Sequence, residues 1–95
     1  MIRQRWFGAT GRRVPELAVE GDPEVPLDGA LVLGDVDDDE LLRREHAQGT
    51  PIVVRAASAE DVRSALRRPE VAAVLVPRSQ PELLELDLTE LTYGA

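Results

Sequence analysis

The chain has 95 residues, of which 43% are apolar, a formal charge of -7 at pH 7 and no cysteine. This length suits one small domain with its own core, and the lack of cysteine excludes disulfides, thiol nucleophiles and Cys-based zinc sites. The apolar runs are too short to span a bilayer or to form the core of a signal peptide, so we expect a cytoplasmic protein without a membrane partner.

Positive charge is concentrated at the start of the chain. Residues 1–13 contain four arginines and no acid, and because the whole chain carries -7, the remaining residues carry -11. This balance argues against nucleic acid as a partner, since such binding depends on neutralising phosphates. Trp6 and Phe7 lie among these arginines, where aromatic rings can stack on bases. We instead expect them to anchor the segment to the core or to a second subunit.

The first 29 residues are expected to form an antiparallel hairpin or an extended segment, followed by a loop. The segments IRQRWF and RRVPELAVE flank the tetrapeptide GATG, and Pro15 restricts the second segment to a sheet edge. The next stretch, GDPEVPLDG, has two prolines and two glycines and therefore the composition of a loop. GATG is too short to be a phosphate-binding loop.

A repeat of 21 residues organises residues 30–86. The apolar runs LVL, IVV and AVL begin at positions 31, 52 and 73. Each run leads to a short polar residue that is followed three positions later by an acid, a pattern typical of a helix start. The repeat predicts strands at 30–34, 51–56 and 71–76, helices at 38–48, 59–67 and 80–86, and the cap residues Asp37, Ser58 and Ser79.

Buried strands that alternate with helices at this spacing indicate parallel pairing through right-handed crossovers. The expected fold is therefore α/β, with a small, mainly parallel sheet of three or four strands built from three βα units. The hairpin precedes these units, and residues 1–95 form a single domain. The tail, residues 87–95, suits either a short helix or a closing strand.

An acidic stretch, residues 35–40, follows the first strand of the repeat. Its last four residues align with the helix starts of the other two units, so helix initiation explains most of it. Asp35 is not needed for a cap, and with Asp37 it forms a candidate Mg²⁺ site at the end of a strand. The pair resembles the first motif of haloacid dehalogenase-type phosphatases, but lacks that motif's following threonine or valine. We assign no cofactor.

The other two strand ends carry arginine and serine. Arg55 and Arg78 follow the second and third strands, and Ser58 and Ser79 begin the helices after them. Guanidinium groups beside helix amino termini form a candidate site for a phosphate or carboxylate. In the competing interpretation these arginines pair with Asp35 and neighbouring acids across the sheet edge and need no ligand.

Residues 50–86 resemble the distal half of a response-regulator receiver domain, in which a strand ending in a hydroxylated residue, a helix and a strand ending in Lys-Pro are similarly spaced. Here Arg55 or Ala56 replaces the hydroxylated residue, and Val76-Pro77 replaces Lys-Pro. The same stretch is about equally similar to one quarter of a phosphate-binding (β/α) barrel. A shared topology does not define function.

No nucleophile, base and orienting group can be assembled from these residues, and the single His46 receives no role. We therefore expect a non-catalytic protein-interaction or regulatory module that binds a protein partner or forms a homodimer, because so small a sheet leaves its edges uncovered. The alternative is a small ligand-binding protein or enzyme component that holds an anion at the carboxyl ends of the strands.

Overall fold

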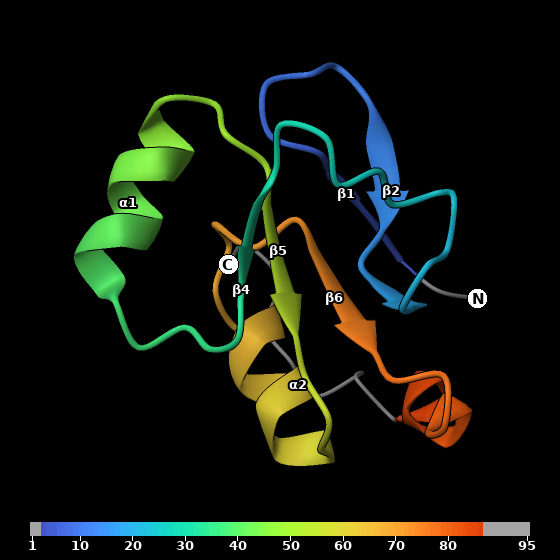
Figure 1. Ribbon diagram of the computed structural model, residues 1–95. Coiled ribbons are helices and arrows are strands. Elements are labelled where there is room, and N and C mark those ends of the chain that lie inside the picture. Colours follow the sequence, from blue (N-terminus) through green and yellow to red (C-terminus); the bar gives the residue numbers. More distant parts are fainter. Residues whose placement is uncertain (1–2, 87–95) are drawn as a thin grey trace.

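The protein has an α/β fold in which an N-terminal antiparallel hairpin precedes a four-stranded parallel sheet with two helices (Figure 1). A computed structural model describes residues 3–86. The hairpin consists of β1 (Gln4–Trp6) and β2 (Arg13–Pro15), which pair antiparallel. The tail at 87–95, for which the sequence suits either a short helix or a closing strand, lies outside the described residues.

The parallel sheet has the strand order β3-β6-β5-β4. The three repeat units supply β4 (Leu31–Leu33), β5 (Ile52–Arg55) and β6 (Ala73–Val76), each within its predicted range. They also supply the helices α1 (Asp39–Ala47) and α2 (Ala59–Leu66). The third predicted helix is instead a 3-10 helix, η1 (Pro81–Glu85), with proline in its first turn and no side-chain cap, so the prediction of Ser79 as a cap was wrong.

The fourth strand, β3 (Leu17–Val19), comes from the segment that we expected to belong wholly to the hairpin. The chain changes its pairing partner at Glu16, whose backbone N–H donates to the Arg3 carbonyl at 2.9 Å while its own carbonyl accepts from the Val74 N–H at 2.8 Å. Residues 13–15 therefore pair with β1, and residues 17–19 pair in parallel with β6.

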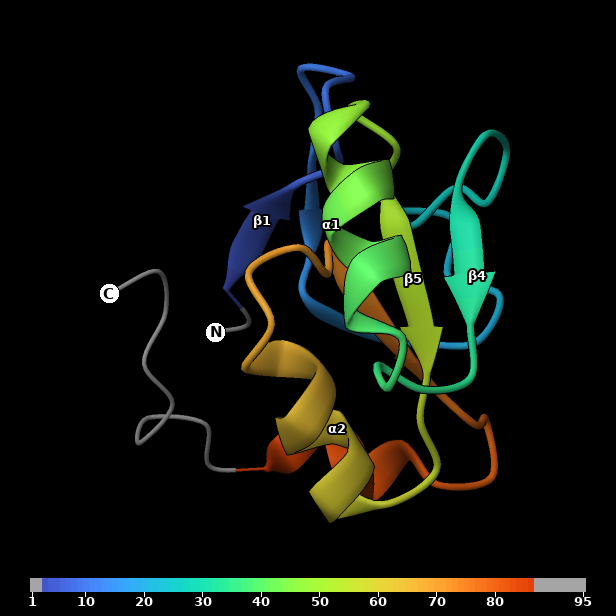
Figure 2. The same cartoon turned by 90° about the vertical axis from the view of Figure 1, so that its left-hand side faces the viewer.

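Both faces of the parallel sheet are covered, and side chains alternate between two apolar clusters as the pleat requires. Val54 and Val74 join the cluster that contains the buried residues of α1, α2 and η1. Val53 and Leu75 join the opposite cluster, which the hairpin and the loop after β3 cover. Figures 1 and 2 show the helices on one side and the hairpin on the other.

The helix caps agree with the repeat at one helix and differ by one residue at the other. The Ser58 hydroxyl accepts from the Asp61 N–H at 3.1 Å, as predicted for α2. At α1 the cap is Asp38, which accepts from the Leu41 N–H at 3.0 Å, so the assignment of Asp37 as the cap was wrong. The Asp37 N–H instead donates to Asp35 Oδ1 at 3.0 Å, which shows that Asp35 shapes the turn before the helix.

None of the helices in the described part of the chain has the length and apolar character that crossing a membrane requires.

Candidate functional site

The carboxyl ends of the parallel strands bring Arg55 and Arg78 together around Glu20, which no sequence pattern marks as a site residue. Arg55 forms a two-point contact with the Glu20 carboxylate, Nε to Oε1 at 2.7 Å and Nη2 to Oε2 at 3.3 Å. Arg78 Nε donates to the backbone carbonyl of Glu20 at 2.9 Å. A hydrogen bond from Arg55 to Glu20 raises the pKa of the guanidinium above its ordinary value. The arginines thus have internal partners, as in the ligand-free interpretation, but the acid is Glu20 and not Asp35.

A hollow of about 390 Å³ lies beside these groups and is lined by both arginines, Glu20 and the residues around Ala56. Ser58 does not line it, and its hydroxyl already caps α2. Ser79 precedes a 3-10 helix of only five residues, which offers a weaker dipole than an α-helix. Of the predicted anion site, the structure therefore assembles the two arginines but not the two serines.

The candidate metal residues Asp35 and Asp37 are exposed and lie beside a small hollow of about 150 Å³ that Asp61 and Ser64 also line. One carboxylate oxygen of Asp35 already accepts the Asp37 N–H. Within residues 3–86, no group of three or more acidic or histidine side chains is arranged to hold a metal ion.

The two aromatic residues of the hairpin have opposite environments. Phe7 is 2% exposed and belongs to the apolar cluster beneath the hairpin, together with Val14 and Ala18. It anchors the hairpin to the sheet and leaves no surface for a partner. Trp6 is 57% exposed, and the guanidinium of Arg13, its cross-strand neighbour, lies 4.6 Å from the ring centroid, a cation–π contact.

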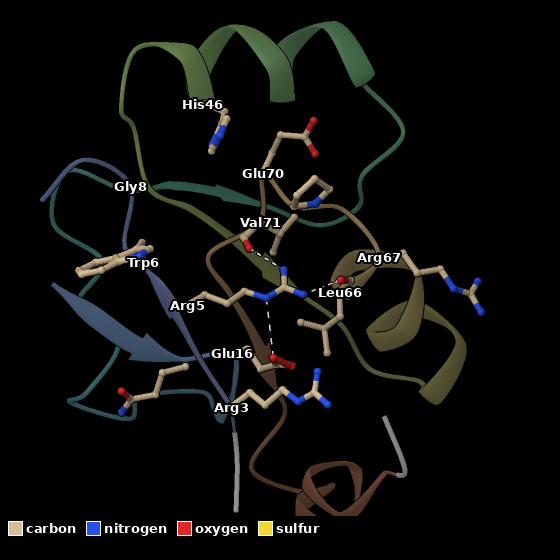
Figure 3. A pocket seen from close by; sticks show the side chains of 12 residues that line it. Arg3, Arg5, Trp6, Gly8, Glu16, His46, Leu66, Arg67, Glu70 and Val71 are labelled. Carbon is tan, nitrogen blue, oxygen red and sulfur yellow. Dashed lines mark hydrogen bonds and ion pairs between the residues drawn. The ribbon is translucent and has the colours of Figure 1, made fainter. Parts of the chain in front are cut away.

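A hollow of about 490 Å³ lies between β1, the C-terminal end of α2 and residues 69–71 (Figure 3). We call it the hairpin hollow. Its lining includes the apolar residues Leu66 and Val71. Trp6 of β1, His46 of α1 and Arg67 at the C-terminal end of α2 also border it. Neither Arg67 nor His46 was a candidate in the sequence, because neighbours so distant in sequence come together only through the fold.

Arg5 lines the hairpin hollow and connects β1 to the C-terminal end of α2. Its guanidinium donates to three backbone carbonyls at and after the end of α2, those of Leu66 at 2.6 Å, Arg68 at 3.1 Å and Val71 at 2.9 Å. Helix ends leave carbonyls without intrahelical partners, and a cation there also interacts favourably with the helix dipole. The hairpin is thus tied to α2 by one side chain.

The buried side chain of Glu16 lies next to the Arg5 guanidinium. The side chain is 1% exposed, and its Oε1 lies 3.7 Å from Arg5 Nε, an ion-pair distance that is too long for a hydrogen bond. Neither carboxylate oxygen has a hydrogen-bond partner among the described residues. Burying a charged carboxylate is costly unless an opposite charge lies beside it, so the charged form of Glu16 depends on Arg5.

The chain matches no protein-family model, and neither a curated protein nor a solved structure gives a match to it.

Proposed function

We propose that this chain is a non-catalytic protein-interaction module that binds a partner, including a second copy of itself, through the exposed face of its hairpin. The observation that carries the proposal is the exposure of Trp6, with Arg13 stacked on it. Tryptophan and arginine are the side chains most often responsible for binding energy at protein interfaces, because each combines a large contact area with a polar or charged group.

The surroundings of Trp6 support the same conclusion. A rigid platform presents it, since Phe7 anchors the hairpin from below and Arg5 ties β1 to α2. A preorganised surface loses little conformational entropy when a partner binds. The Trp6 ring is also next to the hairpin hollow, which would accept a side chain of the partner.

The alternative function, binding of a phosphate or carboxylate at the strand ends, has one observation in its favour: Arg55 and Arg78 border the same hollow of about 390 Å³. The Glu20 carboxylate already neutralises Arg55 by a two-point contact, and an anionic ligand would have to displace it. This competition makes the strand ends the weaker candidate.

Sedimentation velocity over a series of protein concentrations tests the proposal. We expect the sedimentation coefficient of the wild type to rise with concentration and that of Trp6→Ala to stay at the monomer value. Arg43→Ala is the matched control, because its side chain is 73% exposed on α1 and does not line the hairpin hollow. A monomeric wild type that binds inorganic phosphate, and loses this binding in Arg55→Ala, would contradict the proposal and support the alternative.

A further inference from the structure

We infer that the hairpin hollow binds an acidic peptide segment of a partner protein, with an apolar side chain of that segment entering the hollow and its carboxylates contacting the surrounding arginines. The inference rests on the proposed function, because it specifies the chemistry of the partner that the hairpin face would bind.

The apolar part of the hollow explains why a peptide side chain fits it. Pro69, which is exposed, lines the hollow together with the core residues Leu66 and Val71. A volume of about 490 Å³ exceeds that of any single side chain, so an apolar residue and part of its backbone could enter. Burial of that apolar residue would supply the hydrophobic contribution to the binding free energy.

The charges around the hollow explain why the segment should be acidic. The two acids that line it already have arginine neighbours: Glu70 is 3.3 Å from Arg68, and Glu16 is 3.7 Å from Arg5. Arg67 is exposed at the rim and has no ion-pair partner within residues 3–86. Arg13 does not line the hollow itself, but its guanidinium stacks on Trp6, which does.

The hairpin is the positively charged part of an acidic chain, and this favours an acidic protein segment over nucleic acid as its partner. Four arginines and no acids occur in residues 1–13, whereas the rest of the chain carries -11. A nucleic acid requires a basic track that follows several consecutive phosphates. A short acidic peptide needs only the local arginines and can remain clear of the acidic remainder of the molecule.

A second copy of this chain is one source of such a segment. The turn of the hairpin lies at the edge of the sheet where β5 begins, since the Ala9 N–H donates to the Gly49 carbonyl at 2.9 Å. The acidic stretch 35–40 follows the opposite end of β4 (Figure 1). Within one molecule, Asp39 of this stretch already binds Arg68, which adjoins Arg67 on the rim of the hairpin hollow. The other acids of the stretch lie at the opposite end of β4 from the hairpin turn, so a contact between those acids and the turn would join two copies.

Fluorescence anisotropy of a labelled synthetic peptide tests the inference. The probe is a short glutamate-rich peptide with one central leucine, and its control has glutamine in place of every glutamate. We expect the wild type to bind the probe and not the control, with weaker binding at higher salt. Affinity should fall about tenfold in Trp6→Ala and in the double variant Arg13→Ala/Arg67→Ala, and stay within about twofold in Arg43→Ala.

The following results would overturn or support the binding of an acidic segment in the hairpin hollow. Equal binding of the two peptides, or equal binding by the wild type and the double variant, would overturn the inference. Tighter binding of a single-stranded oligonucleotide at the same residues would also overturn it. Competition by a synthetic peptide of residues 34–45 would support it and identify a second copy as a source of the segment. If no acidic peptide binds but self-association still requires Trp6, the inference fails while the proposed function stands.

Discussion

Gly8, in the turn of the hairpin, has φ = +56°, which lies in the left-handed region that L side chains rarely adopt. A Cβ at this position would collide with the backbone carbonyl of Gly49 and with the backbone nitrogen of Pro51. The tight approach of two backbone segments holds the hairpin against the sheet beside the Ala9 to Gly49 hydrogen bond.

We predict that Gly8→Ala destabilises the protein by about 3 kcal/mol, because backbone strain and a backbone clash act together. Gly11→Ala is the matched control: its φ is +77°, but a Cβ there meets open space, so the loss should be about 1 kcal/mol. Urea denaturation followed by Trp6 fluorescence measures both. Similar losses in the two variants would show that the close approach is unimportant.

The interaction of Arg5 with Glu16 gives a second prediction at the scale of single residues. Arg5→Ala removes three carbonyl contacts and leaves the carboxylate of Glu16 buried without a counter-charge, so we expect a loss of about 3–5 kcal/mol. The double variant Arg5→Met/Glu16→Leu removes both charges and should recover part of that loss. A double variant less stable than Arg5→Ala would show that the carboxylate is not the source of the penalty.

At the scale of the elements, the start of α1 distinguishes two neighbouring aspartates. Asp38→Ala should destabilise by about 1 kcal/mol because it removes the acceptor of the Leu41 N–H. Asp37→Ala should change stability by less than about 0.5 kcal/mol, since its side chain has no capping bond. Thermal unfolding of the two variants under one condition compares them. A larger loss of stability in Asp37→Ala than in Asp38→Ala would indicate that Asp37 caps α1, as the sequence repeat predicts.

The first turn of α1 also links its stability to pH. A hydrogen bond from Arg68 and, secondarily, the charge of Arg43 hold the pKa of Asp39 below its ordinary value of 3.8. A carboxyl whose pKa is lower in the folded state stabilises that state above its ordinary pKa, and the contribution disappears as the pH falls through the lower folded value. The wild type should thus be more stable than Asp39→Asn near neutral pH, and the difference should close below about pH 3.8. A difference that is unchanged by acid would contradict this assignment.

The elements predicted from the 21-residue repeat agree with the structure where an apolar run marks a strand. The runs at 31–33, 52–54 and 73–75 are strands because apolar residues there pack on both faces of the sheet. The sequence could not predict that β3 would leave the hairpin at Glu16, because Pro15 marks an edge position but does not determine which strand the following residues pair with. It also indicated an α-helix at 80–86, where Pro81 begins a 3-10 helix.

At the scale of the whole molecule, the candidate sites depend on contacts between distant segments. The pairing of Arg55 with Glu20 joins residues 35 positions apart, and it exists because β3 inserts beside β6. The hairpin hollow likewise combines β1 with the ends of both helices. From its type and its arginine neighbours, the sequence could predict Trp6 as a candidate interface residue, which stays a prediction, whereas the burial of Phe7 beside it required the fold.

We propose that the protein binds its partner through the hairpin face and not through the strand ends. A dilution series of amide ¹H–¹⁵N correlation spectra of the uniformly labelled protein distinguishes the two surfaces. We predict that the Trp6 indole signal and the amides of residues 4–6, 12–13 and 66–71 shift with concentration, while those of residues 55–58 and 77–80 stay constant. Constant hairpin signals combined with shifts at the strand ends would contradict the claim.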